Sequence, residues 1–70
     1  MTIIEINREP VELYKVLKFE GLAASGAEAK QLVAEGFVEV NGVVETRKRR
    51  KLVQGDEIGF DNQLFTLQRI

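Results

Sequence analysis

The sequence predicts an α+β domain in which two helices pack on a small, mostly antiparallel sheet. Two segments have the spacing of amphipathic helices, and short β-branched runs separated by turn signals lie around them. Helices of about ten residues are not stable alone in water, so both need a sheet to pack against. We expect a single domain over residues 1–70, because a chain of 70 residues has no room for a second.

The first part of the chain predicts a strand and then a helix. The β-branched run Thr2–Ile6 is short, as edge strands often are. Pro10 favours a helix entry, since a proline in the first helical turn lacks only an N–H that would have no partner there. Apolar residues up to Leu17 follow helical spacing, and Gly21 is suited to closing a helix. The first helix should therefore cover roughly residues 10–20.

The second helix has a clear start signal. Ser25 and Glu28 have the spacing of a capping box, in which the serine hydroxyl accepts a hydrogen bond from the amide three residues later. Gly36 is placed to end this helix. The apolar stripe expected to face the sheet is Ala29, Leu32 and Val33.

The second half of the chain predicts strands joined by tight turns. Asn41-Gly42 between two β-rich runs is a strong hairpin signal, because both residues tolerate a positive φ. Alternation places Val38 and Val40 on one side of the strand and Phe37 and Glu39 on the other. Further strand segments are expected at Leu52–Val53, Glu57–Phe60 and Leu64–Leu67.

The composition excludes several kinds of chemistry. Cysteine and histidine are both absent, which excludes disulfides, thiol chemistry, the usual zinc sites and serine–histidine or cysteine–histidine catalysis. The carboxylates are scattered over turns and strand faces, so we predict no catalytic residue, no metal site and no cofactor. No segment approaches the apolar length of a membrane span, and we expect a cytoplasmic protein.

The charge is distributed unevenly. Residues 47–51 form an unbroken run of five cations, while the other 65 residues carry five positive and eleven negative charges. Cations this close repel one another across less than a Debye length, and an anionic partner would relieve that repulsion. A solvated loop and a localisation tag are the plain alternatives. The position of the run inside the domain, after a hairpin, favours a binding surface.

The order of motifs resembles the S-four RNA-binding domain, named after ribosomal small-subunit protein four. The resemblance covers about residues 11–60, and its motifs are Gly21–Ala29, Leu32–Val33, Gly36–Gly42 and Gly55–Ile58. It implies a two-helix motif, the αL motif, beside a small sheet, with a positively charged face for structured RNA. Members of the family occur in ribosomal proteins, pseudouridine synthases, tyrosyl-transfer-RNA synthetases and small stand-alone proteins.

The sequence departs from the family pattern in two places. The family usually begins its first helix with arginine, leucine and aspartate, and the corresponding residues here are Glu12, Leu13 and Tyr14. It usually has an arginine after the serine that caps the second helix, and Gly26 occupies that position. Lys30 keeps a position that is commonly basic. We infer that the run at residues 47–51 takes over much of the missing charge.

The predicted function is binding of structured RNA, ribosomal or transfer RNA, as a non-catalytic and translation-associated protein. Four or five phosphate contacts would give a log–log salt slope of roughly −3 to −4.5. Arginine adds bidentate phosphate geometry, and an extended run would point alternate cations to opposite sides. Gly26 would also allow a phosphate to approach the amides of the second helix. The predicted RNA-binding residues are Arg47, Lys48, Arg49, Arg50, Lys51, Lys30, Ser25, Gly26 and Asn41.

Other partners remain open at this stage. The basic run could instead dock an acidic protein surface, and RNase treatment would separate the two cases. Anionic lipid is disfavoured, because no basic amphipathic helix adjoins the run. Phe19, Phe37, Phe60 and Phe65 are expected in the core, which leaves Tyr14 as the aromatic residue for base stacking. We expect a monomer.

Overall fold

The computed structural model describes residues 1–70, with two helices and seven strands. The elements are β1 Thr2–Ile6, β2 Val11–Glu12, α1 Leu13–Phe19, α2 Gly26–Ala34, β3 Val38–Val40, β4 Val43–Val44, β5 Lys51–Leu52, β6 Glu57–Phe60 and β7 Gln63–Arg69. None of the helices is long and apolar enough to cross a membrane.

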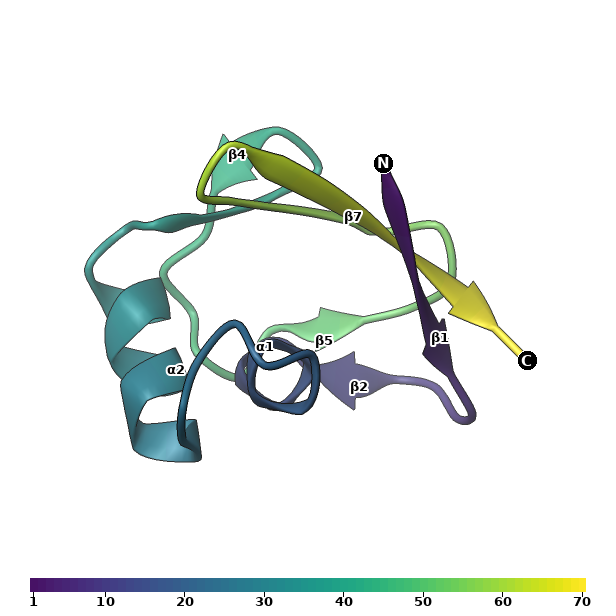
Figure 1. Cartoon of the computed structure of the whole chain (residues 1–70), viewed down its shortest axis with the longest axis horizontal. Helices are drawn as coiled ribbons and strands as arrows, with labels where there is room; N and C mark the ends of the chain where they lie inside the picture. The colour runs from purple at the N-terminus through teal and green to yellow at the C-terminus, as the bar shows by residue number, and fades with distance from the viewer.

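Five strands form one sheet in the order β1-β7-β6-β3-β4. Only the β1–β7 pair is parallel, and the other pairs are antiparallel. Both helices lie on one side of this sheet, below it in the view of Figure 1. The predicted α+β class and the edge position of the first strand are both confirmed.

The core lies between the helices and the inner face of the sheet. Strand alternation works as expected in β3, where Val38 and Val40 are buried and Glu39 is exposed. The helices add buried side chains to the same cluster: Leu13, Val16, Leu17, Ala29 and Val33. Leu32, predicted for this stripe, is only partly buried at its edge.

The predicted tight turn between β3 and β4 is present. Val40 pairs with Val43, so the hairpin loop has two residues. Asn41 has a φ of 53° and Gly42 a φ of 84°, as a primed turn requires. The turn chemistry of Asn-Gly therefore fixed the register of this hairpin correctly.

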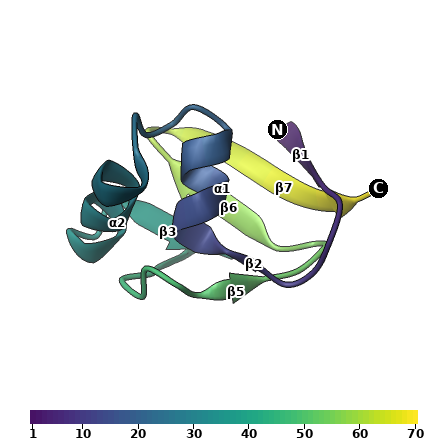
Figure 2. The same ribbon diagram turned by 90° about the horizontal axis from the view of Figure 1, so that it is seen from below.

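The predicted helix entry at Pro10 is wrong. The residues after Pro10 form β2, in which Val11 pairs with Leu52 and Glu12 with Lys51. The backbone groups of β2 are therefore used by a strand that starts with the last residue of the basic run, and the helix begins only at Leu13. Figure 2 shows β2 leading directly into α1 with β5 alongside.

The expectation that all four phenylalanines lie in the core is also wrong. Phe65 is buried and Phe60 is partly buried, but Phe19 is 75% exposed and Phe37 is 59% exposed. Phe19 is the last residue of α1, where the helix leaves the sheet. Phe37 precedes β3 on the same side as Glu39, which is the side away from the helices.

Candidate nucleic-acid interface

Residues 47–50 of the basic run form a loop, the basic loop, that is held against the start of α1, and Lys51 begins β5. Leu13 N donates to Arg50 O at 2.9 Å, and Tyr14 N donates to Lys48 O at 3.1 Å. No side chain caps the N-terminus of this helix, so carbonyl groups of the loop satisfy its first amides. A tight turn, with Arg50 N donating to Arg47 O at 3.2 Å, replaces the extended run that would have alternated its side chains.

A buried carboxylate anchors two arginines of this loop. Glu45 is 6% exposed, and its Oε2 accepts from Arg47 N at 2.9 Å and from Arg47 Nε at 3.0 Å. Its Oε1 accepts from Arg47 Nη2 and from Arg50 Nη1, both at 2.9 Å. Two guanidinium groups therefore converge on one carboxylate, in the charge-assisted geometry that makes strong hydrogen bonds.

These hydrogen bonds change the acidity of the pair. The Arg47 side chain, then the Arg47 amide and then the Arg50 side chain hold the pKa of Glu45 well below its usual range, although burial acts in the opposite direction. The Glu45 carboxylate in turn raises the pKa of Arg47. Glu45 thus offsets one of the two guanidinium charges and anchors both arginines, and the trio keeps a net charge of +1.

A second group of cations surrounds the ring of Tyr14. The Nζ atom of Lys30 lies 4.7 Å from the ring centroid, the Cζ atom of Arg49 lies 5.5 Å away, and the Nζ atom of Lys15 lies 6.0 Å away. These three cations come from α2, the basic loop and α1. We call Tyr14, Lys15, Lys30 and Arg49 the Tyr14 cluster. An aromatic ring face attracts cations through its quadrupole.

The net charge at the Tyr14 cluster is positive. Glu12 is the one carboxylate paired there, at 3.2 Å from Lys15 and 3.8 Å from Arg49. Lys48 and Lys51, the two lysines of the basic run, form no ion pair. The surface around Tyr14 therefore presents several cations against one carboxylate.

The structure separates the predicted binding residues into groups. Lys30 and Arg49 meet at Tyr14, and Gly26 lies beside the same ring, since a Cβ atom at Gly26 would be 3.7 Å from Tyr14 Cε2. The hydroxyl of Ser25 accepts a hydrogen bond from Glu28 N at 3.1 Å, which confirms the predicted cap of α2.

The side chain of Asn41 forms hydrogen bonds that join the β3–β4 turn to a neighbouring segment. Its Nδ2 donates to Asp56 Oδ1 at 3.1 Å, and its Oδ1 accepts from Glu57 N at 2.9 Å. Both ends of the amide are therefore engaged in joining this turn to the segment before β6. The predicted RNA contact of Asn41 would have to compete with these bonds.

Sequence reasoning missed Lys15 as a member of the site. Its position next to Tyr14 was visible, but no local pattern indicates that α2 and the basic loop converge on that ring. The feature that could have indicated Lys15 is the single tyrosine of the chain, which lies between the charged residues Glu12 and Lys15 at the start of a helix.

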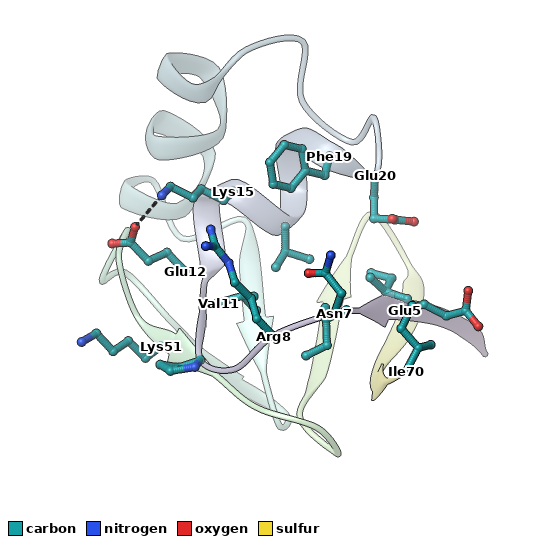
Figure 3. A pocket seen from close by; sticks show the side chains of 14 residues that line it. Glu5, Asn7, Arg8, Val11, Glu12, Lys15, Phe19, Glu20, Lys51 and Ile70 are labelled. Atoms are coloured by element: carbon teal, nitrogen blue, oxygen red, sulfur yellow. Dashed lines mark ion pairs between the residues drawn. The ribbon is translucent and has the colours of Figure 1, made fainter.

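An open groove of about 990 Å³ lies next to this site, between α1 and the segment that joins β1 to β2. Figure 3 shows Lys15, paired with Glu12, at one end of it. Three cations and three carboxylates line the groove, so it carries no net charge and does not extend the positive surface: Arg8, Lys15, Lys51, Glu5, Glu12 and Glu20. No group of three or more carboxylates in the structure is arranged to hold a metal ion.

Comparison with known proteins agrees with this geometry. The family model described as S4 domain matches residues 4–68. The Escherichia coli (strain K12) protein named "Putative RNA-binding protein YbcJ" is 49% identical over 61 residues, which cover 86% of this chain and 87% of that protein. A Shigella flexneri protein named "Uncharacterized protein YbcJ" matches to the same extent.

A solved structure is also similar. The solution structure of YbcJ from E. coli superposes with a TM-score of 0.71 at 44% identity, covering 96% of this chain and 86% of that one. It is described as revealing an αL motif involved in RNA binding. The resemblance found in the sequence is confirmed, and the chain belongs to the S4 domain family.

Proposed function

We propose that this protein binds structured RNA, and that the Tyr14 cluster together with Lys48 contacts the phosphates. The observation that carries this proposal is the convergence of cations from α1, α2 and the basic loop on one aromatic ring. S4 family membership and the description of the similar YbcJ structure support it.

The Tyr14 ring positions its cations without neutralising them. A carboxylate in the same place would hold the Lys30 and Arg49 side chains but offset one of their two charges. The ring attracts them through its quadrupole and leaves the charge available to a phosphate. Arg49 can also bind two phosphate oxygens with its planar guanidinium group, and each neutralised phosphate releases condensed counterions.

We further propose ribosomal or transfer RNA as the target, recognised by shape and backbone rather than by base sequence. Phosphate contacts from a rigid surface select a folded RNA whose backbone has a matching curvature, and they carry no base information. In this proposal the protein is a cytoplasmic, translation-associated monomer without catalytic activity.

Fluorescence anisotropy with a transfer-RNA transcript tests the proposal. The transcript should bind more tightly than an unstructured RNA of the same length, with a log–log salt slope of about −3 to −3.6 for four phosphate contacts. NMR shifts of the labelled protein should centre on Tyr14, Lys30 and Arg49. Absence of salt-dependent binding, or shifts centred elsewhere, would overturn the proposal.

A further inference from the structure

The face of the sheet that points away from the helices has no cover. Register places Leu64, Gly59, Glu39 and Val44 side by side across β7, β6, β3 and β4. They alternate along their strands with the buried residues of the inner face. We call this surface the outer sheet face, and its members are Ile3, Glu5, Phe37, Glu39, Val44, Glu57, Gly59, Leu64, Thr66 and Gln68.

Large apolar side chains are exposed on this face. Phe37 is 59% exposed, Ile3 56%, Val44 54% and Leu64 51%. None of them is needed for the core, which is complete on the other side of the sheet. Phe37 and Leu64 lie close together, and adjoining exposed apolar side chains on a small protein are typical of a contact site for another macromolecule.

A depression of about 360 Å³ lies at one end of the face. Phe37 and Leu64 line it together with Glu39 and Asp61. The missing side chain of Gly59 opens this depression, since a Cβ atom there would lie 3.4 Å from Glu39 Oε1 and 3.6 Å from Leu64 Cδ2. The depression therefore combines apolar walls with two carboxylates.

The outer sheet face carries negative charge only. The strand positions that face outward include Glu5, Glu39 and Glu57, and no lysine or arginine. Glu39, Glu57 and Asp61 form no ion pair within the chain. The field of these carboxylates repels phosphate, so RNA is a poor occupant, whereas a cationic partner gains from the same field.

We propose that the outer sheet face docks a basic segment of a partner protein that carries both cationic and apolar side chains. In the depression, the aliphatic stem of an arginine or lysine from the partner would pack on Phe37 and Leu64, and its charge would reach Glu39 and Asp61. The protein would then have two separate contact surfaces, a cationic one for RNA and an anionic, apolar one for a protein.

A second copy of this chain fits the face less well. The only clustered cations of this chain lie in the basic loop and the Tyr14 cluster. A contact between copies would therefore join the outer sheet face of one copy to the cationic surface of the next, and such a head-to-tail contact does not form a closed two-fold dimer. It would also remove the cations from RNA. A separate protein avoids both problems.

Peptide titrations followed by NMR of the labelled full-length protein test this inference. The probe is a ten-residue peptide of alternating arginine and valine, and its control replaces every arginine with glutamine. We expect the arginine peptide to shift the resonances of Phe37, Glu39, Gly59 and Leu64, and the glutamine peptide to bind at least roughly tenfold more weakly.

Variants locate the site. Glu39→Lys should weaken the arginine peptide roughly tenfold, and Leu64→Ser should weaken it severalfold, while the controls Glu20→Lys and Val43→Ser leave it unchanged. The inference is overturned if the shifts centre on Glu12 and Glu20 in the groove beside α1, if both peptides bind equally, or if neither binds. Concentration-dependent shifts of the protein alone at Leu64 and Arg49 would also overturn it, because they would assign the face to a second copy.

Discussion

Glu45 and Tyr14 each hold basic side chains of the same loop, but only Glu45 carries a charge that offsets theirs. Glu45 binds Arg47 and Arg50 through hydrogen bonds of 2.9–3.0 Å and offsets one of their two charges. Tyr14 holds Arg49 at 5.5 Å, with Lys30 at 4.7 Å, through an uncharged ring. The first arrangement fixes the loop, and the second keeps charge available at its surface.

The difference shows that a run of cations in a sequence is not a measure of the charge available for binding. Arg49 and Arg50 are neighbours in the chain, yet one lies over an aromatic ring and the other reaches a buried carboxylate. Arg47 and Arg50 hold the loop in one conformation. RNA binding then costs less conformational entropy than it would with a mobile loop, which favours binding through the other cations of the loop. The predictions below test this division of roles.

The largest effect is expected at the anchor. Glu45→Gln removes the buried charge that accepts four hydrogen bonds from Arg47 and Arg50. We expect the free energy of unfolding to fall by about 2–3 kcal/mol, a large part of the stability of so small a domain. Urea unfolding measures it, with Glu20→Gln as the control. A loss below about 0.5 kcal/mol would show that Glu45 does not anchor the loop.

The same anchor predicts a pH dependence. Because folding lowers the pKa of Glu45 below its ordinary value of 4.5, its contribution to stability is present above that value and is lost as the pH falls toward the folded-state pKa. Wild type should therefore lose more stability than Glu45→Gln between about pH 5 and pH 3. Thermal melts across this range measure the difference. Parallel curves for the two proteins would contradict the assigned hydrogen bonds.

The second largest effect is expected at the Tyr14 cluster. Lys30→Ala combined with Arg49→Ala should weaken binding of a transfer-RNA transcript about thirtyfold, on the basis of about 1 kcal/mol for each phosphate contact. Stability should change little, because neither side chain is buried. Lys18→Ala, an exposed cation of α1 outside the cluster, is the matched control. Equal losses of RNA affinity in the double variant and in Lys18→Ala would mean that RNA binds through general surface charge and not through the Tyr14 cluster.

A smaller effect, of opposite sign, is expected at Glu12. Glu12→Gln removes the carboxylate that pairs with Lys15 at 3.2 Å and Arg49 at 3.8 Å. Both cations then become fully available, and affinity for the transcript should rise about threefold. Anisotropy titrations against Glu20→Gln measure the gain. A decrease would show that Glu12 positions these cations for RNA.

The smallest effect is expected at Gly26. Gly26→Arg restores a cation that the family usually has, and a Cβ atom there has room at 3.7 Å from Tyr14 Cε2. Affinity should rise about twofold. The same titration with Gly26→Ala separates the effect of charge from that of the side chain itself. An unchanged or lower affinity for Gly26→Arg would mean that the basic loop does not compensate for a missing cation at this position.

Local signals in the sequence were sufficient for much of the fold. The cap at Ser25 and the Asn41-Gly42 turn depend on neighbouring residues, and both are present as expected. The β2–β5 pair was missed because it joins residues some forty positions apart, and Pro10 then favoured a helix. Local patterns do not report such distant pairings.

The candidate site was predictable only in part, for the same reason. The basic run and Lys30 were visible as charges, but their partners were not. Glu45 lies two residues before Arg47 in a segment that reads as exposed, yet folding buries it. The meeting of Lys30 and Arg49 over Tyr14 depends on the packing of α1, α2 and the loop, which no spacing in the sequence encodes.

The salt dependence of RNA affinity tests the division between anchoring and binding cations most directly. Wild type, the Lys30→Ala/Arg49→Ala variant and Lys18→Ala would be titrated with one transfer-RNA transcript over a range of salt concentrations. The loss of two phosphate contacts should make the log–log slope of the double variant shallower by about 1.8, with Lys18→Ala unchanged. A double variant that keeps the wild-type slope would contradict the assignment of phosphate binding to the Tyr14 cluster.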